Sequence, residues 1–224
     1  MRKGSGFLAV WAEPPAKVRP EYLNWLVREH LPQRVGTAGF LNGRIFQDVK
    51  NTGQFFVAYE TSSADVLKSS AYLDRLQSPT VWTQKMVKKL NPIIRGTGDI
   101  VRSWGQGWGG IVAALRFDGA GVERVLREEV TQDILSLHDF EGVVSVRVLK
   151  VDPDITNIRT RERSLRPIDD RSFSGAVMIE GIATDHVSLA VQQLFAICEK
   201  HEVAIPDCLV GRMQYGLDEA ELDS

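Results

Sequence analysis

GFLNGRIFQ at residues 39–47 has a counterpart 103 positions later, GVVSVRVLK at residues 142–150. Both stretches begin with glycine, carry arginine in sixth place and are rich in the β-branched and aromatic residues typical of strands. GFLAVWAE at residues 6–13 matches GGIVAALR at residues 109–116 with the same offset. The fixed offset indicates a tandem duplication, so that the chain consists of two halves of about 100 residues each.

The same order of elements is predicted in both halves, because runs of strand formers alternate with stretches of helical apolar spacing. Pro32 is expected to kink or end the first helix. In the first half, the expected strands are 6–13, 40–49, 54–60 and 93–104, and the expected helices are 20–35, 62–76 and 79–90. In the second half, the expected strands are 110–117, 142–151, 173–182 and 205–217, and the expected helices are 122–137 and 185–200.

This order predicts an α+β fold made of two tandem ferredoxin-like βαββαβ modules. The first module is expected to occupy residues 1–104 and the second residues 108–218, followed by a C-terminal tail at residues 219–224.

The formal net charge of −2 over 224 residues is divided unevenly. Residues 1–103 carry 15 Lys and Arg against 8 Asp and Glu, whereas residues 104–224 carry 12 against 21. So small a net charge argues against a nucleic-acid-binding protein. No apolar run is long enough to cross a membrane, and Cys198 and Cys208 lack metal-binding or redox spacing. We therefore expect a cytoplasmic protein that binds neither nucleic acid nor membrane.

Several residues of the first half resemble one known superfamily. They are Trp25, Glu29-His30-Leu31-Pro32, Gly39-Phe40, Ala71-Tyr72-Leu73 and Pro79-Thr80-x-Trp82-Thr83. The pattern is similar to the dimeric α+β-barrel superfamily, in particular to EthD-like and NIPSNAP-like proteins. The resemblance implies two sheets facing each other in a barrel, here supplied by one chain in place of a homodimer. The superfamily includes small cofactor-independent monooxygenases, lactone isomerases, polyketide cyclases, haem-degrading enzymes and many members of unknown role, so the resemblance implies the fold more specifically than the activity.

His30 is the first candidate for catalysis. It lies on the apolar stripe of the first helix, three residues after Val27, so that it faces inward or borders a pocket. Histidine titrates near neutral pH and is the usual general base or acid. The structural alternative is a histidine that bonds the backbone where Pro32 interrupts the helix.

Arg44 is the second candidate, and Glu60 accompanies it in an otherwise apolar pair of strands. A guanidinium can hold a carboxylate or an enolate oxygen. Arg147 and Glu180 repeat the arrangement in the second half, which favours a structural cross-strand ion pair within each half. Both interpretations stay open from the sequence.

Aromatic residues provide candidate walls for a flat ligand, although each could equally belong to the core. The residues expected to bind substrate are Trp11, Trp25, Asn42, Tyr59, Glu60, Tyr72 and Trp82.

Residues 152–171 form a long connection with five arginines and five acids. A lid, an arm that reaches a second subunit and a mobile hairpin tip are all compatible with a loop of this length. The chain has no phosphate-binding glycine loop, zinc spacing or dinucleotide fingerprint, so we predict no metal and no cofactor. A haem pocket held by a single histidine would leave no motif and stays open.

The sequence thus predicts a cofactor-independent isomerase, lyase, cyclase or monooxygenase that acts on a small aromatic, lactone or polyketide-like acid. In this hypothesis His30 transfers a proton and Arg44 holds the developing oxyanion. The alternative is a non-catalytic protein on the same fold that binds a small molecule or serves assembly. The expected partner is a small apolar or aromatic ligand, and a homodimer is possible.

Overall fold

Eight antiparallel strands form one closed barrel in the computed structural model, which describes residues 4–204 and 207–222. The order around the barrel is β1-β3-β2-β8-β5-β7-β6-β4. Their bounds are β1 Gly6–Ala12, β2 Phe40–Asp48, β3 Phe55–Thr61, β4 Ile94–Gly105, β5 Ile111–Phe117, β6 Val143–Val151, β7 Gly175–Gly181 and β8 Asp207–Asp218.

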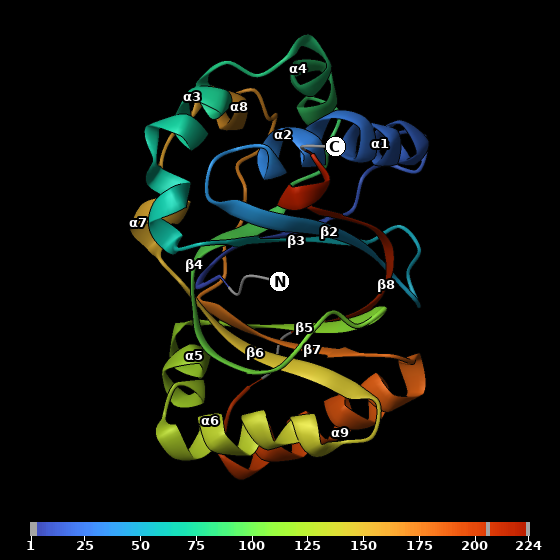
Figure 1. The fold of residues 1–224 in the computed structure, drawn as a ribbon, viewed down its shortest axis with the longest axis vertical. Helices are drawn as coiled ribbons and strands as arrows, with labels where there is room; N and C mark the ends of the chain where they lie inside the picture. The colour runs from blue at the N-terminus through green and yellow to red at the C-terminus, as the bar shows by residue number, and fades with distance from the viewer. Residues whose placement is uncertain (1–3, 205–206, 223–224) are drawn as a thin grey trace.

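Helices cover two opposite sides of the barrel, so that the molecule has three layers (Figure 1). The upper layer contains α1 Arg19–Trp25, the π-helix η1 Leu26–His30, α2 Leu31–Val35, the 3-10 helix η2 Ala64–Lys68, α3 Ser70–Gln77 and α4 Val81–Val87. The lower layer contains α5 Gly119–Val125, α6 Glu128–Leu135, the 3-10 helix η3 Ser136–Asp139 and α9 Thr184–Lys200. No helix of the described residues is long and apolar enough to cross a membrane.

The predicted mixed α+β fold is confirmed, and a single chain closes the barrel. The strands of the first half are adjacent in the order β4-β1-β3-β2, and those of the second half in the order β6-β7-β5-β8. The seams between the halves are the pairs β2–β8 and β4–β6. The predicted start of the last strand at Ile205 lies outside the described residues, as does the end of the predicted tail, whose residues Glu219–Glu221 form a 3-10 turn.

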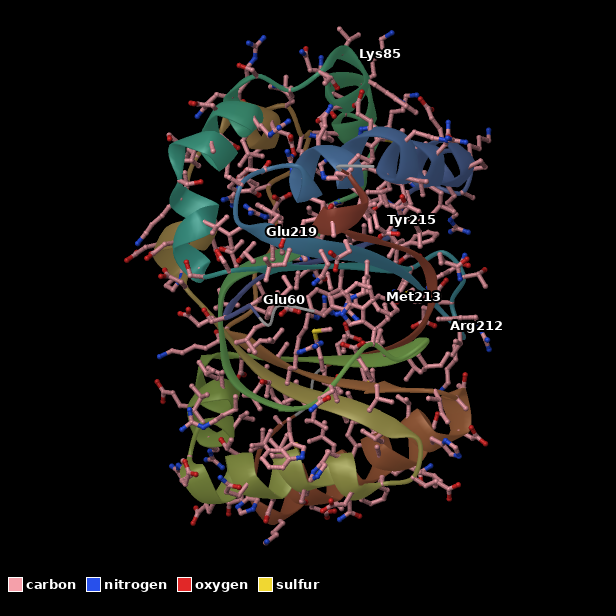
Figure 2. The ribbon with its side chains drawn as sticks, viewed as in Figure 1. Glu60, Lys85, Arg212, Met213, Tyr215 and Glu219 are labelled. Carbon is pink, nitrogen blue, oxygen red and sulfur yellow. The ribbon has the colours of Figure 1, made fainter. Side chains whose placement is uncertain are left out.

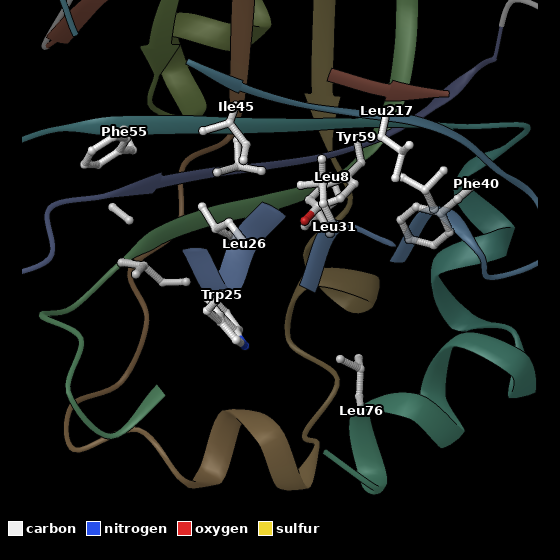
Figure 3. Close-up of a cluster of buried hydrophobic side chains, with 14 of the residues drawn as sticks. Leu8, Trp25, Leu26, Leu31, Phe40, Ile45, Phe55, Tyr59, Leu76 and Leu217 are labelled. Atoms are coloured by element: carbon white, nitrogen blue, oxygen red, sulfur yellow. The ribbon is translucent and has the colours of Figure 1, made fainter. Parts of the chain in front are cut away.

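Three apolar clusters hold the layers together. One fills the barrel interior and includes Phe7, Phe46, Phe56 and Met178, which come from both halves. The second lies between the first-half strands and the upper helices, and the third between the second-half strands and the lower helices. Figure 3 shows the second cluster, with Trp25 and Leu26 of the helical layer facing the strands. Because both faces of the strands are covered, the strands are apolar on both faces.

Residues 152–171, called the arm below, cross from the second half to the upper layer. Their two short helices are α7 Pro153–Thr156 and α8 Arg161–Ser164. Helix α7 packs against β4, and α8 packs against α3 and α4 (Figure 1). Thr156 Oγ1 lies 2.9 Å from Thr97 Oγ1 of β4. Of the three forms predicted for this segment, the lid fits best, because the arm packs against helices and a strand of its own chain.

Candidate functional site

A cavity of about 60 Å³ lies between the first-half strands and the upper helices, and the arm forms one side of it. We call it the His30 pocket. Its apolar and aromatic lining consists of Leu8, Val10, Tyr22, Trp25, Leu26, Val57, Tyr59, Tyr72, Leu76, Leu90 and Ile93. Its polar lining consists of His30, Arg34, Arg95, Thr160, Glu162, Arg163, Arg166 and Asp170.

His30 reaches the pocket from a π-helical turn. The Leu31 amide bonds to the carbonyl of Leu26, five residues back, in place of the usual four. Pro32 follows directly, and its ring would clash with the carbonyl of Arg28 in a regular α-helix. The wider turn relieves this clash, and the chain continues helically to Val35. The predicted irregularity at Pro32 is thus a π-helical turn, a feature common at functional sites.

A hydrogen-bond network fixes this turn to helix α4. Glu29 accepts bonds from the hydroxyls of Thr80 at 2.6 Å and Thr83 at 3.0 Å. The indole of Trp25 donates to Thr83 Oγ1 at 3.1 Å. Glu29, Thr80 and Thr83 all belong to the motif that carries the family resemblance. Together they orient Trp25, whose ring lies against His30.

The His30 imidazole is held neutral. Its ring centroid lies 4.2 Å from that of Trp25, and its Nδ1 is buried without a hydrogen-bond partner. Burial, with a further contribution from Arg34, lowers the pKa of His30 to about 3. A neutral imidazole with a free ring nitrogen can accept a proton from a bound molecule.

Arg34 and Glu162 form a buried ion pair across the pocket, with 2.6 Å between Nη2 and Oε2. The Arg34 guanidinium also lies 5.6 Å from the centre of the Tyr72 ring. Burial alone would raise the pKa of Glu162, but Arg34 more than offsets this and holds that pKa at about 2. Glu162 belongs to the arm and Arg34 to α2, so this pair fastens the arm to the helical layer.

The pocket carries more positive than negative charge. Its lining contains four arginines but only two carboxylates, Glu162 and Asp170. Tyr59 adds a buried hydroxyl without a hydrogen-bond partner, and burial raises its pKa, so that it stays protonated and can donate. An enclosed excess of positive charge with an unused donor favours an anionic ligand.

The structure brings four of the predicted site residues together in this pocket, namely Trp25, His30, Tyr59 and Tyr72. Trp82 packs at the edge of the neighbouring apolar cluster and does not line the pocket. Asn42 is buried opposite Glu60 in the pairing of β2 and β3 and also lies outside the pocket. Trp11 belongs to the cluster in the barrel interior.

Arg44 is separated from His30 by the sheet, which corrects the predicted joint site. Successive residues of a strand face opposite sides, so Ile45 faces the helices and Arg44 the barrel interior. There Arg44 Nη1 lies 2.5 Å from Glu180 Oε2, and Arg147 also pairs with Glu180. The ion pair expected within the first half is replaced by one that joins the halves. Glu60 points into the same interior (Figure 2) and lies 3.9 Å from Arg147.

The charged residues of the pocket were not predicted from the sequence. Arg34 follows His30 by four residues, which places both on one helix face, and this spacing could have identified it. Glu162, Arg163, Arg166 and Asp170 belong to the arm, and nothing in its irregular sequence indicates where it docks. Within the described residues, no cluster of three or more His, Cys, Asp or Glu could hold a metal ion.

Neither a family model nor a curated protein matches this sequence, but solved structures resemble its fold. An anthrone oxidase-like protein has a TM-score of 0.64 at 9% identity, covering 99% of this chain and 95% of that chain. A proposed monooxygenase from Fusobacterium nucleatum has a TM-score of 0.54 at 10% identity, covering 97% and 98%. A mutant chlorite dismutase from Candidatus Nitrospira defluvii has a TM-score of 0.54 at 8% identity, covering 99% and 95%.

Structural similarity at such low sequence identity establishes the fold but leaves the activity open. The predicted dimeric α+β-barrel fold is confirmed at that level. The narrower resemblance to EthD-like and NIPSNAP-like proteins stays a prediction, as does the cytoplasmic location.

The depressed pKa of His30 makes stability depend on pH. The unfolded chain binds a proton at His30 below about pH 6.5, whereas the folded chain does so only near pH 3, so the contribution of His30 to stability is lost as pH falls through this window. One proton corresponds to about 1.4 kcal/mol per pH unit. Between pH 6.5 and 5, we expect the free energy of unfolding to fall by up to about 2 kcal/mol more in the wild type than in His30→Gln.

Urea unfolding at the two pH values measures this difference. His138→Gln, which replaces a histidine in the other half of the chain, is the matched comparison variant. Identical pH dependence in the wild type and His30→Gln would mean that His30 titrates normally in the folded protein.

Proposed function

We propose that the His30 pocket is the active site of a cofactor-independent enzyme that acts on a small aromatic, lactone or polyketide-like acid. His30 accepts a proton from a carbon next to a carbonyl. The observation that carries the proposal is a neutral histidine, with a free buried nitrogen, enclosed in a pocket of excess positive charge.

The chemistry balances without a further reactant. The C–H bond of the substrate breaks, its proton moves to the imidazole, and its electron pair forms an enolate. The Tyr59 hydroxyl donates to the enolate oxygen, and the arginines stabilise the negative charge. Return of the proton to a different carbon gives an isomer. Tyr59 and Arg34 thus take the role that the sequence assigned to Arg44.

The negative charge of the substrate compensates for the weak basicity of His30. A histidine whose conjugate acid has a pKa of about 3 is a poor base on its own. Arg34 and Arg166 contribute to that low value, and a bound carboxylate cancels part of their field. Binding of an acid therefore raises the pKa of His30 toward the range in which it can accept a proton.

The size of the pocket limits the substrate. A volume of about 60 Å³ holds roughly four to six waters, which occupy about 120–180 Å³ as liquid. A single ring with one or two small substituents fills that space. A larger, fused-ring substrate would require the arm to move aside.

Solvent deuterium exchange tests the proposal. Pyruvate and a carboxymethyl-substituted unsaturated γ-lactone are small enough for this pocket, and each carries both a carboxylate and an acidic C–H next to a carbonyl. We expect the protein to accelerate exchange in one of them, and His30→Gln to lower this rate about 10²-fold, at the lower end for a positioned base because the base is weak. Exchange is followed by proton NMR.

Tyr72→Phe is the matched control, because it removes a hydroxyl from the pocket lining without touching the proposed base, and its exchange rate should stay near that of the wild type. Unchanged exchange in His30→Gln would exclude His30 as the base, provided that the variant unfolds at the wild-type temperature.

A non-catalytic small-molecule-binding protein is the second candidate, favoured by the same low basicity of His30. Binding of these acids without any acceleration of exchange would support it. An assembly protein is a weaker candidate, because the arginine-rich arm packs against its own chain.

We also infer that the halves are tandem modules, residues 1–104 and 108–218. The shared order of elements and the equivalent strand adjacency in the barrel support this division. A homodimer stays a prediction, and closing the barrel does not require one.

A further inference from the structure

A second and larger cavity, of about 600 Å³, opens at one end of the barrel. Strands β1 and β5 end there, and β3, β4 and β8 begin there. We call it the barrel-end cavity. It is lined by Trp11, Ala12, Glu13, Gln54, Phe55, Asn91, Pro92, Ile94, Arg116, Ile168, Asp169, Arg171, Asp207 and Leu209. None of these residues lines the His30 pocket.

Arg116 is the deepest charge of this cavity. Its side chain is 11% exposed, and its guanidinium lies 4.9 Å from the centre of the Trp11 ring. One guanidinium nitrogen, Nη2, pairs with Asp207. The other, Nη1, is buried and has no hydrogen-bond partner. A buried cationic donor without a partner is costly, and an oxygen of a ligand would satisfy it.

Arg171 supplies a second positive charge at the same place. Its backbone is fixed to the start of β4, because its amide donates to the Ile93 carbonyl and its carbonyl accepts from the Arg95 amide, both at 2.9 Å. Its guanidinium has no ion-pair partner in the described part of the chain. Burial and the nearby Arg171 lower the pKa of Arg116 to about 10, as expected for two cations that share a site.

The carboxylates of the cavity lie farther out. Glu13, Asp169 and Asp207 are all exposed, where water screens them, and Asp207 is already paired with Arg116. Apolar surface comes from Phe55, Ile94 and Leu209. The cavity therefore has a buried cationic donor, Arg116, at its inner end and an apolar wall beside it. Its carboxylates lie at the exposed rim, where water screens their charge.

We propose that the barrel-end cavity is a second small-molecule site, which binds an organic carboxylate with a flat apolar body. The carboxylate accepts a hydrogen bond from Arg116 Nη1 and faces Arg171. The apolar body lies along Phe55, Ile94 and Leu209. Asp169 and Arg171 line this cavity whereas Asp170, between them, lines the His30 pocket, so the arm separates two independent sites.

Three naphthalene probes test the proposal on the full chain, because a fused ring exceeds the His30 pocket as it stands. They are 2-naphthoate, neutral 2-naphthalenemethanol and cationic 2-naphthylmethylamine, and binding is measured by calorimetry. We expect 2-naphthoate to bind at least tenfold more tightly than either analogue, as for a hydrogen bond to a charged group. Arg116→Met should weaken 2-naphthoate about tenfold or more, and Arg171→Gln about threefold.

Tyr59→Phe serves as the control, since it removes an unpartnered hydroxyl from the His30 pocket and breaks no bond to the arm, and it should leave the affinity for 2-naphthoate within twofold. Arg171 is exposed, so that Arg171→Gln decides the question if Arg116→Met does not fold. Tighter binding of the amine would show that the acidic rim dominates and would overturn the proposal. Equal binding of the three probes or no binding would also overturn it. So would loss of binding in Tyr59→Phe but not in the Arg116 or Arg171 variants.

Discussion

Glu180→Gln is expected to lower the free energy of unfolding by about 3–5 kcal/mol, because it leaves buried charge without its partner. Glu180 is fully buried and accepts from Arg44, from Arg147 and from the Gly109 amide at 3.2 Å. Burial would raise the pKa of Glu180, but the two arginines lower it below its usual value. A neutral amide in its place leaves two arginines facing Glu60 alone. Urea unfolding at pH 7 measures the loss.

Arg44→Met provides the second corner of a double-mutant cycle. Replacing both partners removes the charge imbalance, so Arg44→Met/Glu180→Gln should cost clearly less than the sum of the single changes. Glu199→Gln, at the end of α9, is the exposed control and should change stability by less than about 0.5 kcal/mol. Additive losses in the double variant would mean that the two side chains do not interact energetically.

This network matters because it joins the two halves inside the barrel. Arg44 and Glu60 come from the first half, whereas Arg147 and Glu180 come from the second. Hydrogen bonds between strands close the seams without specifying which side chains meet across the interior. Charges with one complementary arrangement specify how the halves fit together.

The sequence predicted the elements well for a physical reason. Strands covered on both sides must be apolar, and apolar runs such as residues 40–49 and 54–60 are recognisable without a structure. The repeat also indicated that Arg44 and Arg147 play equivalent parts. Which acid each would meet depended on how the sheets face each other, a long-range property that local patterns do not contain.

The same limit applied to the candidate site. His30 was predicted because it lies on a helix stripe and in a motif. The arm residues Glu162 and Asp170 have no periodic pattern around them, so their place beside His30 depends on how the arm docks. A long charged connection indicated a functional segment, but its docking site required the structure.

Glu162→Gln is expected to release the arm. The change leaves Arg34 buried without its partner and raises the excess positive charge of the pocket, which repels Arg163 and Arg166 of the arm itself. Loss of one partner of a buried pair costs about 3–5 kcal/mol. Because α7 and α8 are short, this cost is expected to appear mainly as local opening, so that global stability changes less. Trypsin, which cleaves after arginine, should therefore cut the arm about 10²-fold or more faster than in the wild type.

The cleavage rate reports the population of the open arm when opening and closing are fast. Asp154→Asn is the matched control, because Asp154 is an exposed acid of the same arm, and its rate should stay near that of the wild type. If Glu162→Gln is cut no faster than this control, the ion pair does not hold the arm closed, and the other contacts of the arm, such as the bond between Thr156 and Thr97, hold it in place. Faster cleavage would show that the arm can open at the cost of one ion pair, which is the movement that a fused-ring substrate would need in order to reach His30.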